Sequence, residues 1–376
     1  MNPETQRRLV ERIRAHQVEG RHSTDTVAHT LTVATDTYAS ERRHAAERQL
    51  FTSQPMVAGL SDLLPGPGTH AAIHVGDRPV LITRDGDGRV SAMLNMCRHR
   101  GAQVATGCGA ASMLSCPYHG WTYRLDGTAA ARRRSEFFAD EPMADLIALP
   151  VAEIDGIIWV SADPDGTIGD DPLQGAAEEI GPLDLGDHRL FDATSFTRPL
   201  NWKIVIDTFT EAYHVAVLHE ASLAPMIHSD FALFDAFGRH GRLVSTRRSI
   251  DGLGDADPST WSLLPHATIL WFLVPNTVLI YQQDHAQLYQ ARPGRHAGEA
   301  HIDVALYVPR DSTRSEEHWR KNFDLLVSVT DTEDFATGVG MQQGFSTGAM
   351  ESVVFGRNEP ALQHFHQSLD SLLSAD

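Results

Sequence analysis

The stretches Asn95-Met96-Cys97-Arg98-His99-Arg100-Gly101 and Cys116-Pro117-Tyr118-His119-Gly120-Trp121 decide the architecture of this chain. Each pairs one Cys with one His, spaced C-x-H in the first stretch and C-x-x-H in the second. Two thiolates on one iron and two neutral imidazoles on the other are the ligands of a Rieske [2Fe–2S] cluster. A Gly follows each half and lets backbone amides approach the cluster sulfurs. The spacing therefore predicts a cluster held by Cys97, His99, Cys116 and His119.

A zinc site of two Cys and two His uses the same donor atoms and is the alternative. Zinc fingers, however, place their two Cys together and their two His together, whereas each half of this pattern carries one of each. Cys108 is the remaining cysteine, so the disulfide that joins the cluster loops of respiratory and photosynthetic Rieske proteins cannot form. We interpret Cys108 as a buried or loop thiol without function.

The composition is that of an ordinary globular protein, with 42% hydrophobic and 21% charged residues. Three Cys, at least two of them cluster ligands, are typical of a reducing compartment. The first residues lack the apolar core of a signal peptide, and no apolar run approaches the roughly 18 residues that span a bilayer. We therefore expect a cytoplasmic protein without a membrane partner. A formal charge of −18 disfavours nucleic acid as a partner.

Changes in the hydrophobic pattern divide the chain into three segments. Residues 1–45, with apolar residues at helical intervals and a capping pair at Ser23-Thr24, predict N-terminal helices that pack on the last segment. Residues 46–165 alternate short strands with turns and predict a small all-β domain around the cluster. Residues 166–376 predict an α+β domain with an antiparallel sheet. Its expected strands include 267–280 and 301–307, and its expected helices are 200–219, 316–327 and 361–373.

A second metal site is indicated by His214 and His219. Two His and one carboxylate, with open positions, form the facial triad of non-haem Fe(II) oxygenases. Residues five apart lie about 140° apart around a straight helix, so the helix must end or carry a π-bulge between them if both bind one iron. Two His at this spacing are a weak signal alone, but a cluster that delivers single electrons needs an acceptor. The pattern therefore predicts a mononuclear iron in the last segment.

The chain resembles the catalytic α subunits of Rieske non-haem iron oxygenases, the aromatic ring-hydroxylating oxygenase family. The resemblance covers nearly the whole chain and rests on the cluster doublets, Asn201-Trp202-Lys203, Tyr213-His214 with His219, and Glu333-Asp334 followed by Gln342-Gln343-Gly344. It implies a small Rieske domain and a larger catalytic domain of helix-grip, START-like type.

The resemblance also implies roles for three acidic residues. Asp334 would be the third iron ligand, with its neighbours Asp331 and Glu333 as the residues that could take its place. Glu211 would be the acid that bridges a Rieske His of one subunit to an iron-bound His of the next. Asp is usual at that position, and carnitine-type monooxygenases share the Glu. Asp207 would lie near the iron, where it orients a ligand or relays a proton.

In this family, electrons from NAD(P)H reach the cluster and then the Fe(II) through a separate reductase, directly or with a ferredoxin. The resemblance therefore implies O2-dependent hydroxylation of an aromatic or other small organic substrate, as ring dihydroxylation or monohydroxylation. The alternative is an O- or N-demethylating or quaternary ammonium monooxygenase, and the remote alternative is a Rieske electron carrier without catalysis. The family also implies a homotrimer, with or without a small β subunit.

Three smaller features stay open at this point. Arg132-Arg133-Arg134 is either a solvated face or a contact for a subunit or an acidic redox partner. His285 is a candidate contact for a polar substrate group. We interpret His366 as a core or surface histidine.

Overall fold

The computed structural model describes residues 1–18, 24–255 and 257–374, and their contacts group into two compact units. One unit is Arg48–Pro172, and the other combines Met1–Glu47 with Leu173–Asp376. The boundaries expected from the sequence, 45/46 and 165/166, lie slightly earlier in the chain. Ser23, of the expected capping pair, lies outside the described residues.

The unit Arg48–Pro172 is built from three small antiparallel sheets, with strand orders β10-β5-β4-β3-β6, β11-β12-β2 and β7-β8-β9. The Gly- and Asp-containing turns between its strands are those that the alternating pattern predicts. Its core gathers around the cluster residues, since Cys97 and Cys116 pack with Trp121 and Tyr123. The strands are β2 (Pro55–Leu60), β3 (Thr69–Val75), β4 (Arg78–Arg84), β5 (Val90–Leu94), β6 (Cys108–Ala110), β7 (Met113–Ser115), β8 (Thr122–Arg124), β9 (Ala129–Ala131), β10 (Ala148–Leu149), β11 (Val151–Ile154) and β12 (Ile157–Ser161).

The other unit contains a seven-stranded antiparallel sheet in the order β13-β19-β18-β17-β16-β15-β14. The strands are β13 (His188–Arg198), β14 (Leu233–Phe237), β15 (His240–Thr246), β16 (Ala267–Leu273), β17 (Thr277–Gln282), β18 (His285–Pro293) and β19 (Ala300–Pro309). Residues 267–280, expected as one strand, form most of β16 and β17. The chain turns between them at Val274-Pro275-Asn276, because Pro lacks the N–H that a ladder needs.

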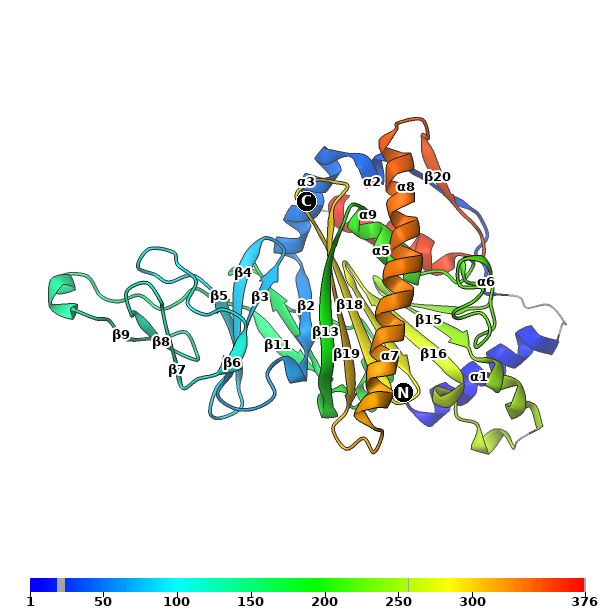
Figure 1. The fold of residues 1–376 in the computed structure, drawn as a ribbon, viewed down its shortest axis with the longest axis horizontal. Coiled ribbons are helices and arrows are strands. Elements are labelled where there is room, and N and C mark those ends of the chain that lie inside the picture. The colour runs from blue at the N-terminus through cyan, green and yellow to red at the C-terminus, as the bar shows by residue number, and fades with distance from the viewer. Residues whose placement is uncertain (19–23, 256, 375–376) are drawn as a thin grey trace. The chain divides into compact units, whose positions relative to one another are not determined.

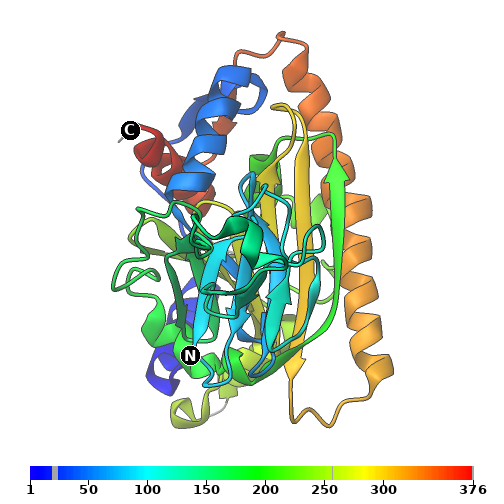
Figure 2. The ribbon, with the colours of Figure 1, turned by 90° about the vertical axis from the view of Figure 1, so that its left-hand side faces the viewer.

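Helices cover this sheet. Figures 1 and 2 show one long helical run (orange) beside it, made of α7 (Glu316–Val329), the π-helical turn η8 (Thr330–Phe335) and α8 (Ala336–Ser346). Helix α5 (Trp202–Phe209) contacts β17, β18 and β19 and also η8, while α9 (Pro360–Ser374) contacts β14 and β15. The α+β class with an antiparallel sheet is therefore confirmed. The other helices are α1 (Pro3–Val18), α2 (Asp36–Ala39), α3 (Glu41–Ser53), α4 (Ala177–Ile180) and α6 (Val215–Leu218).

Two helical expectations are wrong in detail. Residues 200–219 do not form one helix, because α5 ends at Phe209 and the four-residue α6 follows only from Val215. In the N-terminal segment, Leu31–Ala34 is not helical but forms the strand β1, which pairs antiparallel with β20 (Ser352–Phe355). Pairing with a strand more than 300 residues away overrides the local helical spacing. No helix among the described residues combines the length and apolarity that crossing a membrane requires.

Candidate metal centres

The four predicted cluster ligands lie in two turns that share one hydrogen-bond pattern. The amide of each Cys donates to the carbonyl five residues later, and the amide of each Gly donates to the carbonyl of its Cys. The bonds are Cys97 N to Ala102 O, 2.8 Å, Gly101 N to Cys97 O, 2.9 Å, Cys116 N to Trp121 O, 2.8 Å, and Gly120 N to Cys116 O, 3.0 Å. Gly101 and Gly120 have φ of 79° and 72°, a left-handed conformation that favours Gly. Each Gly therefore also closes its turn.

The donor atoms in these turns fit a [2Fe–2S] cluster. Cys97 and Cys116 are free thiols, 2% and 3% exposed. The rings of His99 and His119 lie 4.7 Å apart, and the Nδ1 atom of each is buried without a hydrogen-bond partner among the described residues. Buried polar atoms are rarely left without a partner, so two orphaned nitrogens beside two buried thiols indicate metal ligation. Cys108 lies outside this group, and the expected buried or loop position is wrong, because Cys108 is exposed on the strand β6.

Tyr123 contacts the cluster turn and was not singled out from the sequence. Its hydroxyl lies 3.4 Å from Cys97 Sγ and accepts a hydrogen bond from the Arg98 amide at 3.1 Å. Since the phenol oxygen already accepts from Arg98, its proton is available to the sulfur. Burial, then the bond to Cys97, raises the pKa of Tyr123 and keeps it a donor. Hydrogen bonds to ligand sulfurs tune the reduction potential of such clusters.

The break after α5 brings the two predicted iron-binding His together. His214 directly precedes α6 and His219 directly follows it, so the short helix separates them and neither lies on a straight helix. Asp334 lies in the π-helical turn η8, and its Oδ1 is 3.1 Å from His219 Nε2 and 3.7 Å from His214 Nε2. One ligand atom from each of the three residues lies within 4.8 Å of the others. A π-turn does occur at the site, but it carries the carboxylate and not the His pair.

The three acidic residues of the turn η8 contact different partners. Asp331 accepts a hydrogen bond from Arg198 Nε at 2.8 Å. Glu333 Oε2 accepts from His219 Nδ1 at 2.8 Å and from Ser222 Oγ at 2.9 Å. Asp334 alone faces both Nε2 atoms. Of the three acids left open by the sequence, the geometry favours Asp334 as the ligand.

Each of the two His has a carboxylate on its Nδ1. Glu211 Oε1 accepts from His214 Nδ1, and Glu211 Oε2 also accepts from the His214 amide at 3.1 Å. Glu333 has the equivalent place on His219. A carboxylate on Nδ1 fixes the tautomer that leaves Nε2 free to bind a metal. Burial opposes charge on His219, but Asp334 and Glu333 outweigh it and raise the pKa of its imidazole.

Asp207 is buried and held by two residues from distant segments. Its Oδ2 accepts from the Tyr38 hydroxyl at 2.6 Å, and its Oδ1 accepts from His366 Nε2 at 2.8 Å. His366 is thus a core histidine with a specific partner. Tyr38, Asp207 and His366 are each at most 8% exposed, so this network does not reach solvent. Neither Tyr38 nor His366 is a predicted iron ligand, so these bonds fix Asp207 within the core, and its role in orienting a ligand or relaying a proton stays a prediction.

The Asn201-Trp202-Lys203 motif anchors the start of α5. The Asn201 side chain accepts from the Lys203 amide at 3.0 Å, which caps the helix. Trp202 Nε1 and Lys203 Nζ both donate to Glu47, at 2.8 and 2.7 Å. Glu47 and Lys203 are fully buried, and nothing in the sequence marked them as a pair.

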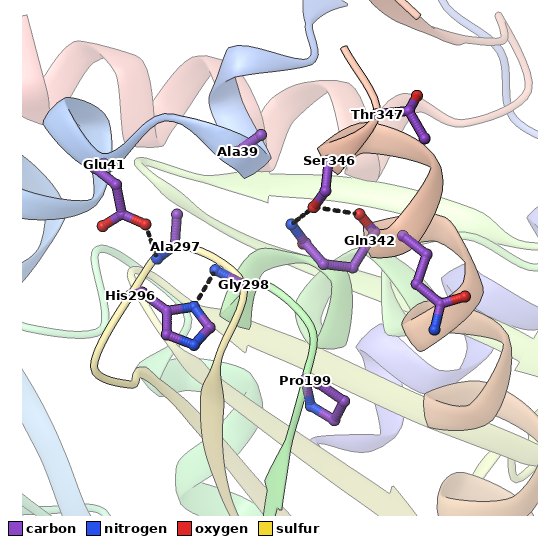
Figure 3. A pocket seen from close by; sticks show the side chains of 10 residues that line it. Ala39, Glu41, Pro199, His296, Ala297, Gly298, Gln342, Ser346 and Thr347 are labelled. Carbon is purple, nitrogen blue, oxygen red and sulfur yellow. Dashed lines mark hydrogen bonds between the residues drawn. The ribbon is translucent and has the colours of Figure 1, made fainter. Parts of the chain in front are cut away.

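Gln342, from the late motif, also positions α5. Its Oε1 accepts from the Asn201 amide at 3.0 Å. Gln342 also lines a cavity of about 470 Å³, together with Pro199, His296, Gly298 and Ser346, among others. Figure 3 shows the Gln342 amide bonded to Ser346 at this cavity. No metal-ligand candidate is among its lining residues, so the cavity is separate from the triad.

Two family models match the chain. The Rieske [2Fe-2S] domain matches residues 54–137, and the ring hydroxylating alpha subunit (catalytic domain) matches residues 185–375. The first match spans both Cys/His turns and shows a [2Fe–2S] domain, not a zinc domain.

Curated relatives with similar sequences are oxygenase subunits. The glycine betaine monooxygenase oxygenase subunit of Chromohalobacter salexigens is 30% identical over 197 residues, 51% of this chain and 44% of that protein. The carnitine monooxygenase oxygenase subunit of Escherichia coli is 33% identical over 181 residues, 47% of this chain and 48% of that protein. Choline monooxygenase from Spinacia oleracea is 32% identical over 185 residues, which are 47% of this chain and 42% of that protein. The chain thus spans about half the length of the curated relatives it matches.

Solved structures share the fold over nearly the whole chain. The quaternary ammonium Rieske monooxygenase CntA in complex with L-carnitine is 20% identical with a TM-score of 0.78, covering 91% of this chain and 95% of that one. Naphthalene 1,2-dioxygenase from Rhodococcus sp. is 15% identical with a TM-score of 0.75, covering 98% of each chain. At these identities the likeness establishes the fold alone. Together with the catalytic-domain match over half of the sequence, it means that this chain belongs to the ring-hydroxylating oxygenase α-subunit family, with a Rieske cluster and a mononuclear iron as its two metal centres.

Proposed function

We propose that the chain is the oxygenase component of a Rieske monooxygenase that hydroxylates a small quaternary ammonium or N-methylated compound with O2. The observation that carries the oxygenase activity is the convergence of His214, His219 and Asp334 within 4.8 Å. Two His and one carboxylate leave positions open on a bound Fe(II) for O2. An electron carrier without catalysis would not need this triad.

The substrate class rests first on the relatives. Those above are named for glycine betaine, carnitine and choline, which all carry a trimethylammonium group. These names support the quaternary ammonium alternative over the aromatic ring that the family resemblance first suggests. Glu211 supports the same substrate class, since carnitine-type monooxygenases also have Glu at this position.

An aromatic pair from the end of α5 and from β18 fits a cationic substrate. The rings of Phe209 and Tyr289 lie 4.4 Å apart. Burial, then the negative charge of Asp334, raises the pKa of Tyr289 well above its usual range. Aromatic faces attract quaternary ammonium groups. His285 instead packs on Trp319. Trp319 precedes Asp334 by 15 residues in the same helical run, which separates the two by about 20 Å along the helix axis. The position of His285 therefore does not support a substrate contact.

The chain's own residues orient the reaction. When bound, the iron would supply O2 activation and the cluster single electrons. His214 and His219 would present Nε2 while Glu211 and Glu333 hold their Nδ1 protons. One oxygen atom enters a C–H bond beside the nitrogen, and the other leaves as water with two protons and two electrons. The hydroxylated carbon then becomes a carbonyl as its C–N bond breaks and the amine departs.

A single-turnover reaction tests this proposal. Iron-replete protein with a chemically reduced cluster would be mixed with O2 and a panel of trimethylammonium compounds, N-methyl amines, aryl ethers and arenes, and products identified by mass spectrometry. We expect one added oxygen atom, or formaldehyde or an amine released, with trimethylammonium or N-methyl substrates. Two oxygen atoms on adjacent carbons of an arene would contradict the substrate class. An Asp334→Asn variant should keep the cluster spectrum and form no product.

A further inference from the structure

Arg132, the first residue of the Arg132-Arg133-Arg134 run, does not belong to a solvated face. Its guanidinium carbon lies 4.9 Å from the Phe138 ring and 5.6 Å from the Trp121 ring. Its Nη2 donates to the Phe138 carbonyl at 2.5 Å. Arg133 and Arg134 are exposed, and Arg134 pairs loosely with Glu136 at 3.5 Å. The run therefore contains two surface cations and one that is packed on aromatic rings.

Both rings contact the predicted cluster ligand His99. The Trp121 indole is 6% exposed and stacks on the His99 imidazole, with ring centroids 4.7 Å apart and planes 8° apart. Phe138 meets both rings edge-on. The guanidinium, indole and imidazole thus form a contact chain whose links of 5.6 and 4.7 Å keep the Arg132 charge within about 10 Å of His99.

The positive charge in this chain of contacts is not neutralised locally. Arg132 makes no salt bridge with the described residues, and its Nη1 is buried without a hydrogen-bond partner among them. A half-buried cation without a carboxylate is unfavourable for folding. The cation–π contacts offset part of that cost. Because Arg132 is partly buried, its charge is screened less than that of an exposed cation.

We propose that Arg132 is a positioning residue of the Rieske cluster: it holds Trp121 against His99, and its charge favours the reduced, more negative state of the cluster. This inference rests on the cluster alone and not on the substrate proposed above. One electron added to the cluster is attracted by the guanidinium. At about 10 Å and an effective dielectric constant near 20, that attraction changes the equilibrium constant for reduction about tenfold, or about 60 mV for a one-electron couple.

A redox titration with a matched control tests the proposal. The potential of the cluster would be measured by EPR on purified protein carrying Arg132→Met, Arg132→Lys or Arg133→Met. Arg133→Met removes the same charge from the adjacent, exposed residue. We expect Arg132→Met to lower the potential by about 60 mV, with a much smaller change in Arg133→Met. Arg132→Lys should retain most of the potential, but with altered cluster g-values because the planar stack on Trp121 is lost.

Other outcomes would overturn the proposal. Equal shifts in Arg132→Met and Arg133→Met would mean a general surface-charge effect. An unchanged reduction potential in Arg132→Met would show that the Arg132 charge does not influence the cluster. Arg132→Gln, which can still donate to the Phe138 carbonyl, is the second neutral variant if Arg132→Met loads no cluster. If both neutral variants lack the cluster while Arg133→Met loads normally, Arg132 builds the turn and does not tune its potential. None of these readouts depends on finding a substrate.

Discussion

At the scale of single residues, the candidate iron site contains two His whose Nδ1 atoms bind carboxylates from different elements. Glu211 comes from the loop after α5, three residues before its own His. Glu333 comes from η8, next to the predicted ligand Asp334, and its Oε2 accepts from both His219 and Ser222. Adjacent acidic residues on a helix point in different directions, so one can bind the metal while the other holds a ligand's proton.

Glu333→Gln should weaken iron binding without affecting the cluster. The amide cannot hold the His219 Nδ1 proton as a carboxylate does, and loss of such a partner typically costs about 10–100-fold in metal affinity. Competition with a chelator would measure the affinity, and cluster absorbance would report on the cluster. Ser222→Ala, which leaves the Glu333–His219 bond in place, is the control and should have a smaller effect. Unchanged affinity in Glu333→Gln would contradict the assigned role.

Tyr123→Phe should lower the reduction potential of the cluster. The phenol donates to Cys97 Sγ, and a hydrogen bond stabilises the reduced cluster more because its sulfurs carry more charge. A difference of about 1 kcal/mol between the two states corresponds to roughly 40 mV for one electron. Spectroelectrochemical titration checks the shift, and a potential equal to that of the unchanged protein would show that the contact does not tune the cluster.

At the scale of elements, helix α5 is fixed at its start so that the loop after it can present Glu211 and His214. Asn201 caps the helix, and Lys203 is bonded to both carboxylate oxygens of Glu47 from α3. Asp207, one turn later, is bonded to residues of α2 and α9. The position of the ligand loop therefore depends on three other helices.

Glu47→Leu should destabilise the unit that contains α5. Burial lowers the pKa of Lys203 while Glu47 opposes this, and without Glu47 the ammonium is left buried and unpaired. Breaking such a pair costs about 3–5 kcal/mol, which lowers the midpoint of thermal unfolding by roughly 10 °C. The double variant with Lys203→Met should recover much of that loss, because two apolar side chains leave no charge without a partner. Calorimetry would distinguish these results, and a double variant no better than Glu47→Leu would contradict the pairing argument.

Glu359, between β20 and α9, is a half-buried acid whose carboxylate interacts with Glu211 and Asp207. Burial raises the pKa of Glu359, the hydrogen bond from the Gly356 amide opposes this, and the like charges of Glu211 and Asp207 add to the rise. The folded state therefore binds this proton more tightly than the unfolded chain, and stability due to Glu359 is lost as the pH rises through the folded pKa. Glu359→Gln should raise the unfolding midpoint near pH 7, and the gain should vanish below about pH 4, where the acid is protonated in both states. A gain that persists at low pH would have another cause.

At the scale of the whole molecule, electrons must pass from a Rieske cluster to a mononuclear iron. The family resemblance implies that they pass between neighbouring subunits, through Glu211, in a cyclic trimer. Tyr213 and Val217, next in the chain to or between the predicted iron ligands His214 and His219, are 64% and 82% exposed, which fits a surface that a second copy covers.

Mixed oligomers test transfer between subunits. One chain carrying Cys97→Ser lacks the cluster, and another carrying His214→Ala lacks the iron, so each should be inactive alone. Co-expressed and co-purified, they should regain part of the activity, since an intact cluster can then lie beside a neighbour's intact iron. The readout is oxidation of the pre-reduced cluster in single turnover with a substrate from the panel. Inactivity of mixed trimers, shown by tagged chains to contain both variants, would contradict transfer between subunits.

The sequence alone predicted the four cluster ligands and the two His of the iron site, and it determined the α+β class, because ligand spacing and strand alternation are local properties. The local pattern nevertheless predicted a helix at Leu31–Ala34, which is wrong, because this segment is a strand that pairs with Ser352–Phe355. Only the tertiary structure decided which of three neighbouring acids faces both Nε2 atoms, and that Arg132 stacks toward the cluster while Arg133 faces solvent. Likewise, Glu333 meets His219 across 114 positions and His366 meets Asp207 across 159. Contacts over such separations leave no periodicity in the chain; they exist because packed helices bring these side chains together.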